Sequence, residues 1–353
     1  MIDALSLENV VLPQEKTYYR IALTFSILVW IAVAATLVGP LYALGAAFAL
    51  WLTNGLLIAR LRSESVEVTE TQFPELHATH QEVCRSLGQA STPPLYILQS
   101  GGVLNAFATR HGGRDFVVIH SSFLEALGES GPAIRFLIGH EIGHVRRKHL
   151  FKRLFILPGY VVPLLGHAYS RACEATCDRH GLLAAGETAG ATRALLVLAA
   201  GKEGAPKGNA SEFAEQHYRH RGFFVSWHEL NSGYPTLSRR VSNLLALEDP
   251  RFARPAERHP LAYFFSFFVS PQMGIAAYVI FILVILAIPA FKRAKAQSEK
   301  IRKQHLEQSQ GNAQPPAPAG DPAPIILPSL PTPPPSAPSE PASSTSATPP
   351  SGN

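Results

Sequence analysis

The chain has 353 residues, a formal net charge of +5 and three cysteines. Its mean hydropathy of +0.09 is high for a soluble protein that ends in a long polar tail, so the composition favours a membrane protein. Three cysteines cannot make a disulfide framework, which excludes the class of small secreted proteins stabilised by disulfides and suits a reducing compartment.

An N-terminal segment, residues 1–19, precedes two apolar runs. The first run, residues 21–38, is just long enough to cross a hydrocarbon core of roughly 30 Å. The second run, residues 41–58, is interrupted mainly by Asn54. Together they predict a transmembrane helical hairpin over residues 20–60, and the cations at its ends favour the cytoplasm for both outer ends. The alternative for the second run is a buried core helix.

Two short strands are predicted at residues 96–99 and 116–120, near Gly-Gly turns. An edge strand beside an active-site helix can pair with the extended backbone of a substrate. Asn105, Ala106 and Phe107 lie between the two strands in the sequence. We therefore expect these three residues to line a substrate cleft.

Residues 140–144 read His-Glu-Ile-Gly-His and are the most informative stretch of the chain. On a helix, His140 and His144 project from one face, so both imidazoles can reach one Zn²⁺ at about 2.0–2.1 Å. Glu141 is rotated off this axis and can take a proton from a water that zinc acidifies. Pro132 and the apolar residues after it predict a buried helix here. The pattern is the signature of a zinc metalloprotease.

A second helix is predicted around Glu174 and Asp178, which are also four residues apart. A catalytic zinc with two histidines needs a third protein ligand, and Glu174 is the candidate. Asp178 is then placed to accept the other N–H of a ligand histidine. The alternative is a solvated acidic pair. Cys173 and Cys177 are either soft zinc ligands or, as we favour, small apolar side chains that pack on the helix.

Residues 201–222 are rich in Gly, Lys, Glu and His, and we expect a mobile loop that either gates the cleft or is simply solvated. His228 and Tyr234, which follow this loop in the sequence, are candidates to donate a hydrogen bond to the developing oxyanion. The mechanism needs such a donor opposite the zinc.

A third apolar stretch, residues 261–291, predicts a C-terminal transmembrane segment, and the basic cluster after it would be held in the cytoplasm. A chain that crosses a membrane three times ends on the side opposite to its start, so three spans cannot leave both outer flanks in the cytoplasm. Residues 261–272 and 273–291 could form a bent hairpin, residues 154–168 could enter the membrane, or the catalytic domain could be extracytoplasmic. We favour a bacterial inner membrane protein with a cytoplasmic active site.

Residues 292–353 are first basic and then dominated by Pro, Ala and Ser. Such a tail cannot bury enough surface to fold, so we expect disorder with polyproline II character. Residues 331–335 could dock in an aromatic groove of a partner, although a passive tail is the simpler alternative. The basic cluster suits membrane headgroups, and no nucleic-acid partner is expected because no nucleic-acid motif is present.

Five motifs occur in one order between residues 65 and 250. They are Phe73-Pro74-Glu75-Leu76, Asn105-Ala106-Phe107-Ala108, Phe116-Val117-Val118-Ile119, residues 140–144 with His149 beyond, and residues 169–178. In this order they resemble the integral-membrane zinc metallopeptidases typified by the bacterial heat-shock protease HtpX and the eukaryotic CAAX prenyl protease. Two departures are Cys177, where the family usually has Ala, and Tyr234-Pro235, where many members have His-Pro.

We therefore expect an α+β fold: a mostly helical, zincin-like metallopeptidase domain with a small β-sheet over residues 64–255, plus transmembrane helices. The expected activity is that of a zinc metalloendopeptidase with one Zn²⁺ per chain, acting on protein or peptide substrates at a lipid bilayer. The resemblance implies membrane protein quality control. A narrow-specificity processing protease, a hydrolase of a non-peptide bond and an inactive membrane scaffold that recruits partners through its tail are the alternatives.

Overall fold

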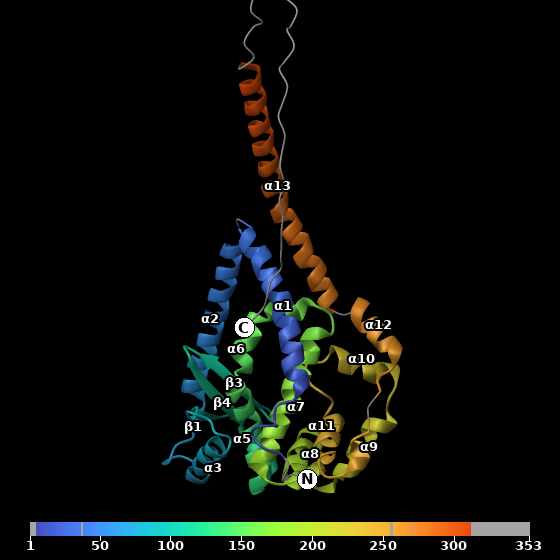
Figure 1. Ribbon diagram of the computed structural model, residues 1–353. Helices are drawn as coiled ribbons and strands as arrows, with labels where there is room; N and C mark the ends of the chain where they lie inside the picture. The colour runs from blue at the N-terminus through green and yellow to red at the C-terminus, as the bar shows by residue number, and fades with distance from the viewer. Residues whose placement is uncertain (1–4, 37, 255–256, 270, 312–353) are drawn as a thin grey trace, which may run out of the picture. The chain divides into compact units, whose positions relative to one another are not determined.

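The computed structural model describes residues 5–36, 38–254, 257–269 and 271–311. It divides into two units, Met1–Ala296 and Gln297–Asn353; the elements discussed below belong to the first, except that the last helix continues into the second. Figure 1 follows them along the chain. In chain order they are α1 (Pro13–Ala35), α2 (Gly39–Glu64), β1 (Val66–Glu67), α3 (Pro74–Ser86), β2 (Leu95–Leu98), β3 (Ala106–His111), β4 (Arg114–His120), α4 (Ser121–Leu127), α5 (Gly131–Arg146), α6 (His149–Phe155), η2 (Leu157–Val161), α7 (Leu165–Ala185), α8 (Thr188–Gly204), η3 (Ala205–Lys207), α9 (Ala210–Arg219), α10 (Phe223–Asn231), α11 (Leu237–Leu245), η4 (Pro250–Phe252), α12 (Pro260–Phe268) and α13 (Pro271–Gly311). The chain is therefore mostly helical with a small sheet, which confirms the predicted α+β class.

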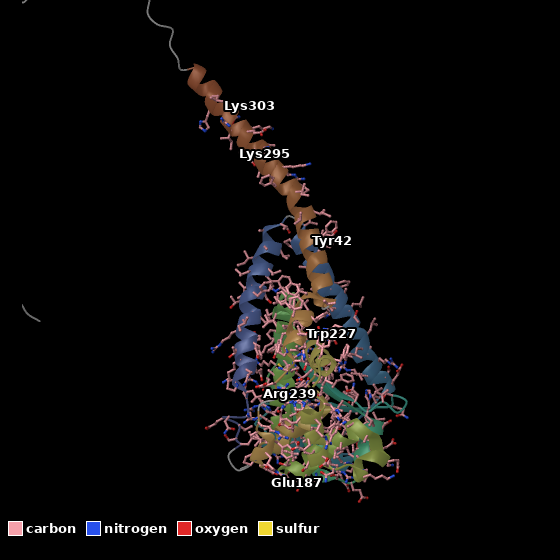
Figure 2. The ribbon with its side chains drawn as sticks, turned by 90° about the vertical axis from the view of Figure 1, so that its right-hand side faces the viewer. Tyr42, Glu187, Trp227, Arg239, Lys295 and Lys303 are labelled. Carbon is pink, nitrogen blue, oxygen red and sulfur yellow. The ribbon has the colours of Figure 1, made fainter. Side chains whose placement is uncertain are left out.

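The predicted N-terminal hairpin is present as α1 and α2. Both helices are long and apolar enough to cross a membrane, and few of their side chains are buried within the chain. Tyr42, near the turn between them, projects from the end of the hairpin in Figure 2. Helix α1 begins at Pro13, earlier than expected, because its first turns also pack against the rest of the chain: Glu15 and Ala22 are buried. The hairpin is thus both a candidate anchor and a packed part of the domain.

Asn54, which interrupts the second apolar run, joins α2 to the sheet through hydrogen bonds. The Asn54 side chain donates to the backbone oxygen of Arg110 and accepts from Thr109 Oγ1 at 3.2 Å. Both partners lie on β3, so Asn54 fastens α2 to the sheet. The alternative of a buried core helix is not supported, because only 6% of the apolar window of α2 is buried.

The four-stranded sheet has the order β1-β2-β4-β3, in which β2 and β4 are parallel and the other pairs are antiparallel. Strands β2 and β4 match the two predicted strands. Strand β3 was not predicted as a strand, and it forms one edge of the sheet next to α5. A turn at Gly112 and Gly113, which have φ of 56° and 81°, joins β3 to β4. Glycine favours this left-handed conformation.

Helices α5 and α7 pack face to face in the core. Two glycines of α5 allow this close approach. A Cβ at Gly139 would lie 2.5 Å from Ala184 Cβ, and a Cβ at Gly143 would lie 3.2 Å from Cys177 Cα. Because neither position carries a side chain, the zinc-motif face of α5 lies directly against α7.

The mobile loop predicted over residues 201–222 is wrong. Helix α8 extends to Gly204, and α9 follows with its first turn capped by Asn209, whose side chain accepts from Glu212 N. Buried Ala214 and His217 lie on one face of α9. The polar composition concealed an amphipathic helix, since its apolar face is narrow.

The apolar stretch of residues 261–291 falls on two helices. Helix α12 ends at Phe268 and α13 begins at Pro271, and α13 then continues through the basic cluster to Gly311. The labels of Lys295 and Lys303 in Figure 2 mark this cluster on α13. The Pro/Ala/Ser-rich segment from residue 312 onward, including residues 331–335, lies outside the described residues.

Candidate metal centre and active site

Helices α5 and α7 bring together the three predicted zinc ligands. His140 Nε2 lies 3.3 Å from Glu174 Oε2, and His144 Nε2 lies 3.5 Å from Glu174 Oε1. Ligand atoms at about 2.0–2.1 Å from one tetrahedral zinc would be about 3.3 Å apart. The spacing and the mixed nitrogen–oxygen donor set therefore fit Zn²⁺, and these three residues are one of the groups in the chain that could hold a metal ion.

Asp178 lies beside His140 in the core. Its Oδ1 lies 3.0 Å from His140 Nδ1, which leaves Nε2 directed toward Glu174. Asp178 also accepts two hydrogen bonds from Arg240, at 2.6 and 2.9 Å. Burial opposes ionisation of Asp178, but the charge of Arg240 holds its pKa at about 2. The carboxylate is therefore ionised and bridges two cationic or donor groups.

Arg240 is a residue that the sequence analysis missed. It lies on α11, and it occupies the apolar stripe formed by Leu237, Val241 and Leu244 at helical spacing. A charged residue on a buried helical face requires a buried partner of opposite charge. That placement was the signal that could have revealed Arg240, although the sequence does not say that Asp178 is its partner.

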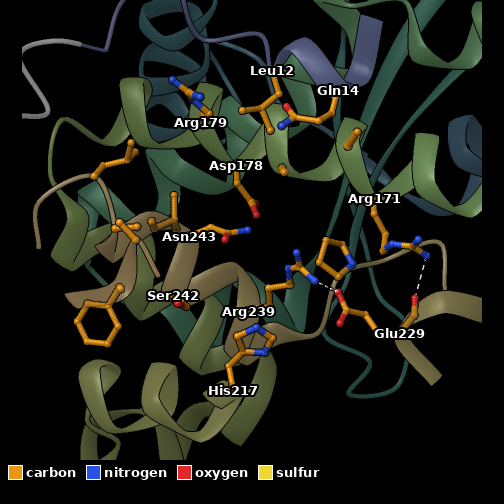
Figure 3. A pocket seen from close by; sticks show the side chains of 18 of the residues that line it. Leu12, Gln14, Arg171, Asp178, Arg179, His217, Glu229, Arg239, Ser242 and Asn243 are labelled. Carbon is orange, nitrogen blue, oxygen red and sulfur yellow. Dashed lines mark hydrogen bonds and ion pairs between the residues drawn. The ribbon is translucent and has the colours of Figure 1, made fainter. Parts of the chain in front are cut away.

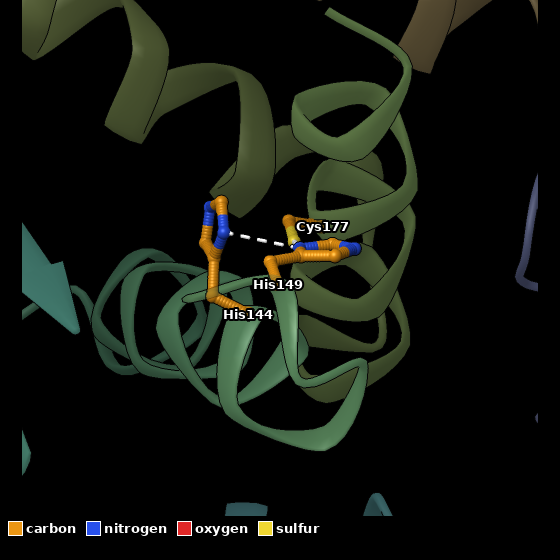
Figure 4. Close-up of side chains that lie close together, drawn as sticks. All are labelled: His144, His149 and Cys177. Atoms are coloured by element: carbon orange, nitrogen blue, oxygen red, sulfur yellow. Dashed lines mark hydrogen bonds between the residues drawn. The ribbon is translucent and has the colours of Figure 1, made fainter. Parts of the chain in front are cut away.

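His144 is supported from the opposite side by His149. Their Nδ1 atoms are 3.2 Å apart, as the dashed line in Figure 4 shows. His149 Nε2 lies 3.2 Å from Glu15 Oε1 on α1, and Glu15 also accepts two bonds from Arg147, at 3.0 and 3.1 Å. Burial lowers the pKa of His149, so its ring is neutral. One pair of tautomers fits these contacts: Nδ1 of His144 donates to Nδ1 of His149, and the protonated Nε2 of His149 faces the Glu15 carboxylate.

Glu141 faces the same centre as the three ligands. It lines a cavity of about 190 Å³ together with His140, His144 and Glu174. Burial raises the pKa of Glu141 to about 7. A carboxylate with a raised pKa is a stronger proton acceptor than an exposed one, which suits a general base.

The predicted cleft residues Asn105, Ala106 and Phe107 line this cavity, and the last two begin edge strand β3. Of the two oxyanion candidates, Tyr234 lines the cavity, and the negative charge of Glu174 raises the pKa of its hydroxyl. His228 lies on α10 and is not among the described residues that line the cavity. The geometry therefore brings Tyr234 to the centre and leaves His228 outside it.

Cys177 and Cys173 also lie near the histidines. Cys177 could form a metal-binding group with His144 and His149, and Cys173 could form one with Glu15 and His149. Figure 4 shows Cys177 beside His149, at 3.6 Å between Sγ and Nδ1. Burial raises the pKa of both thiols, so neither is a ready thiolate ligand. This favours the interpretation of both as small packed side chains.

A second cavity, of about 550 Å³, lies against another face of α7 and is rich in arginine (Figure 3). Arg239 and Arg258 both pair with buried Glu229. Arg171 donates to the backbone oxygens of Glu229, Leu230 and Ser232. These contacts fasten α10 to α7 and α11. Asp178 lines this cavity as well, so the arginine network borders the support of His140.

Comparison with known proteins finds similarity to metallopeptidases. Residues 70–165 match the model of Peptidase family M48. The chain is also similar to a protein of Arabidopsis thaliana named "Plastoglobule-localized metallopeptidase 48, chloroplastic", with 27% identity over 226 residues. This match covers 58% of the chain and 64% of the relative, which is less than two thirds of its length. No solved structure matches the chain significantly.

Proposed function

We propose that this chain, whose residues 70–165 match the model of Peptidase family M48, is a membrane-anchored, zinc-dependent endopeptidase of that family. One observation carries the proposal. His140, His144 and Glu174 meet at zinc-binding distances in a cavity that also holds the carboxylate of Glu141. A protein that only recruits partners has no need of this complete set, which disfavours the inactive scaffold.

The three ligand residues would hold one Zn²⁺. When bound, this ion supplies a Lewis acid that polarises the scissile carbonyl and acidifies water. Glu141 takes one proton from the attacking water as the new C–O bond forms. It then delivers this proton to the leaving amine as the C–N bond breaks. Asp178 and His149 hold the two ligand imidazoles in the tautomer that leaves each Nε2 free for the metal.

The substrate would lie along β3. An edge strand offers unpaired backbone N–H and C=O groups to an extended peptide, so affinity would come mainly from the backbone. Phe107 at the start of the strand contributes an apolar wall to the cavity. We propose Tyr234 as the donor to the developing oxyanion. A binding mode of this kind suits an enzyme that cleaves misfolded proteins of varied sequence, and membrane protein quality control is our proposal for the role.

The comparisons do not support the bacterial inner membrane expected from the sequence, and we propose anchoring through α1 and α2 in a membrane, with the active site on the cytoplasmic side. The support is the length and apolar composition of the two helices and the cations at their outer ends. The named relative is assigned by its name to chloroplast plastoglobules, which is a different compartment.

Cleavage of casein by detergent-purified enzyme tests the proposal. We expect activity that needs zinc, is lost with a chelator, and is lost in Glu141→Gln although that variant still binds zinc. Glu125→Gln, on α4 outside the cavity, is the matched control and should retain activity. Full turnover by Glu141→Gln would refute the mechanism. Bound zinc without any casein cleavage would instead favour a narrow-specificity processing protease or the scaffold.

A further inference from the structure

Helix α1 fixes the position of a segment of the metallopeptidase domain. Trp30 Nε1 donates to the backbone oxygen of Phe155 at 3.1 Å, and Gly159 N donates to Ser26 Oγ at 2.9 Å. The end of α6 and the start of η2 therefore lie beside residues 26–30 of α1. At 1.5 Å per residue, these residues are about 8–13 Å beyond the start of the apolar run at residue 21. If α1 crosses a bilayer, the segment beside it lies within the bilayer too.

The side chains of this segment are arranged for lipid. Four apolar residues of α6 and η2 are exposed: Phe151, Leu154, Phe155 and Leu157. Its two cations have partners within the chain, although Arg153 is itself exposed. Arg153 donates to Tyr160 Oη at 3.0 Å and to Ser170 Oγ at 2.7 Å, and Lys152 Nζ lies 5.4 Å from the centre of the Tyr19 ring. A surface with several exposed large apolar side chains, whose cations are engaged by partners in the chain, is unusual for a water-facing surface.

A second exposed apolar surface lies on α10 and α12. Helix α12 contains no charged residue, and its Phe264 and Phe268 are more than half exposed, as is Phe224 of α10. Nine residues of helix measure about 13 Å, too short to cross a core of roughly 30 Å. The helix is held to α10 by the Phe223–Phe265 ring contact at 5.3 Å. Figures 1 and 2 both show α10 at the end of the domain from which α1 and α2 extend.

We propose that these two exposed apolar surfaces, on α6–η2 and on α10–α12, lie in the lipid bilayer beside α1, so that the metallopeptidase domain is partly immersed. The bilayer is the occupant we choose, because the α6–η2 surface is continuous with the exposed apolar side chains of α1. Soluble proteins seldom leave so many large apolar side chains exposed together. This inference rests on the proposed anchoring by α1.

Immersion has a consequence for the substrate. Leu150 and Arg153 of α6 line the active-site cavity, whereas Phe151 and Leu154 of the same helix face outward. Helix α6 is therefore the wall between the cavity and the lipid. A peptide would reach β3 from the membrane surface, so the substrates would be segments that emerge from the bilayer.

Spin labels on the full chain in phosphatidylcholine–phosphatidylglycerol vesicles test the proposal. Single substitutions Phe155→Cys and Phe264→Cys report on the two surfaces, Leu28→Cys reports on α1, and Arg193→Cys, on an exposed position of α8, reports on water. The three native cysteines are buried and should not label. Casein cleavage by each labelled variant checks that the protein is folded.

We expect the ratio of collisions with oxygen to collisions with a water-soluble nickel chelate to be several-fold higher at residues 155 and 264 than at 193, and close to that at 28. A water-like ratio at 155 or 264 with a lipid-like ratio at 28 would overturn immersion and leave the anchor intact. Low access of both reagents at 155 or 264 would also overturn it, because a protein would then cover that surface. A water-like ratio at 28 would refute the anchoring itself.

Discussion

The Glu15 carboxylate lies 3.2 Å from Nε2 of His149, which joins the N-terminal helix to the candidate metal centre. The other ring nitrogen of His149 meets His144. Glu15 is far from the zinc motif in sequence, yet its carboxylate lies against the histidine that contacts one candidate ligand. The candidate anchor helix therefore contributes to the geometry of the site that it would hold at the membrane.

Loss of the Glu15 charge should weaken zinc binding. In Glu15→Gln, His149 loses the carboxylate that fixes its tautomer, so His144 is less well oriented. Removing a partner of this kind typically lowers metal affinity about 10–100-fold. Competition between the protein and a fluorescent zinc chelator measures the change. Glu64→Gln, at the exposed end of α2, is the control and should bind zinc like the wild type; equal affinities in all three proteins would contradict the role of Glu15.

The Arg240–Asp178 pair should contribute to stability as well as to activity. Arg240→Met leaves Asp178 buried without its cation, which should lower the free energy of unfolding by about 3–5 kcal/mol. The double variant Arg240→Met/Asp178→Asn should recover part of the lost stability, because no buried charge is left unpaired. It should not recover the peptidase activity, because His140 no longer has the Asp178 carboxylate beside it. Thermal unfolding in detergent measures the stabilities.

The control for this pair is Arg251→Met, since Arg251 is 76% exposed beside Asp249. An exposed ion pair contributes about 0–1 kcal/mol. Equal losses of stability in Arg240→Met and Arg251→Met would show that the buried pair contributes no more to stability than the exposed pair.

Alanine at Gly139 should destabilise the chain although alanine is the better helix former. Its methyl group would press on α7, and overpacking of this kind costs about 1–3 kcal/mol. Gly131→Ala, at the start of the same helix with open space around it, is the matched comparison. It should be neutral or stabilising, by up to about 1 kcal/mol. If Gly139→Ala proved as stable as Gly131→Ala, the close packing of α5 on α7 would be wrong.

The buried carboxylate of Glu229 should make stability depend on pH. Burial opposes its ionisation, but Arg258 and Arg239 lower its pKa below the unfolded value of about 4.3. The resulting stabilisation is present above about pH 4.3 and is lost as the pH falls through the lower folded pKa.

Glu229→Gln should therefore be less stable than wild type at pH 7, and the difference should shrink below about pH 4. Melting temperatures across this range measure it. Glu212→Gln removes an exposed acid that pairs with Arg219, and it should leave the profile unchanged. A constant difference between Glu229→Gln and wild type at all pH values would contradict the assignment.

Much of the candidate site follows from local sequence. Residues four apart on a helix share a face, so His140 with His144, and Glu174 with Asp178, were predictable as pairs. The apolar periodicity around residues 132–145 predicted α5, and the hydropathy predicted the hairpin. Strand β3 was not predicted, because its alternation is weak and its pairing with β4 is decided by the sheet.

What the sequence determined by itself is therefore the candidate chemistry, namely a candidate zinc-ligand set and a candidate base, together with two helices able to cross a membrane and the α+β class. The tertiary structure decided which distant residues support that chemistry. Arg240 reaches Asp178, and Glu15 reaches His149, across separations of 62 and more than 100 residues. No periodicity encodes such contacts, because they depend on how α1, α7 and α11 pack. The same packing placed Tyr234 at the cavity and left His228 away from it.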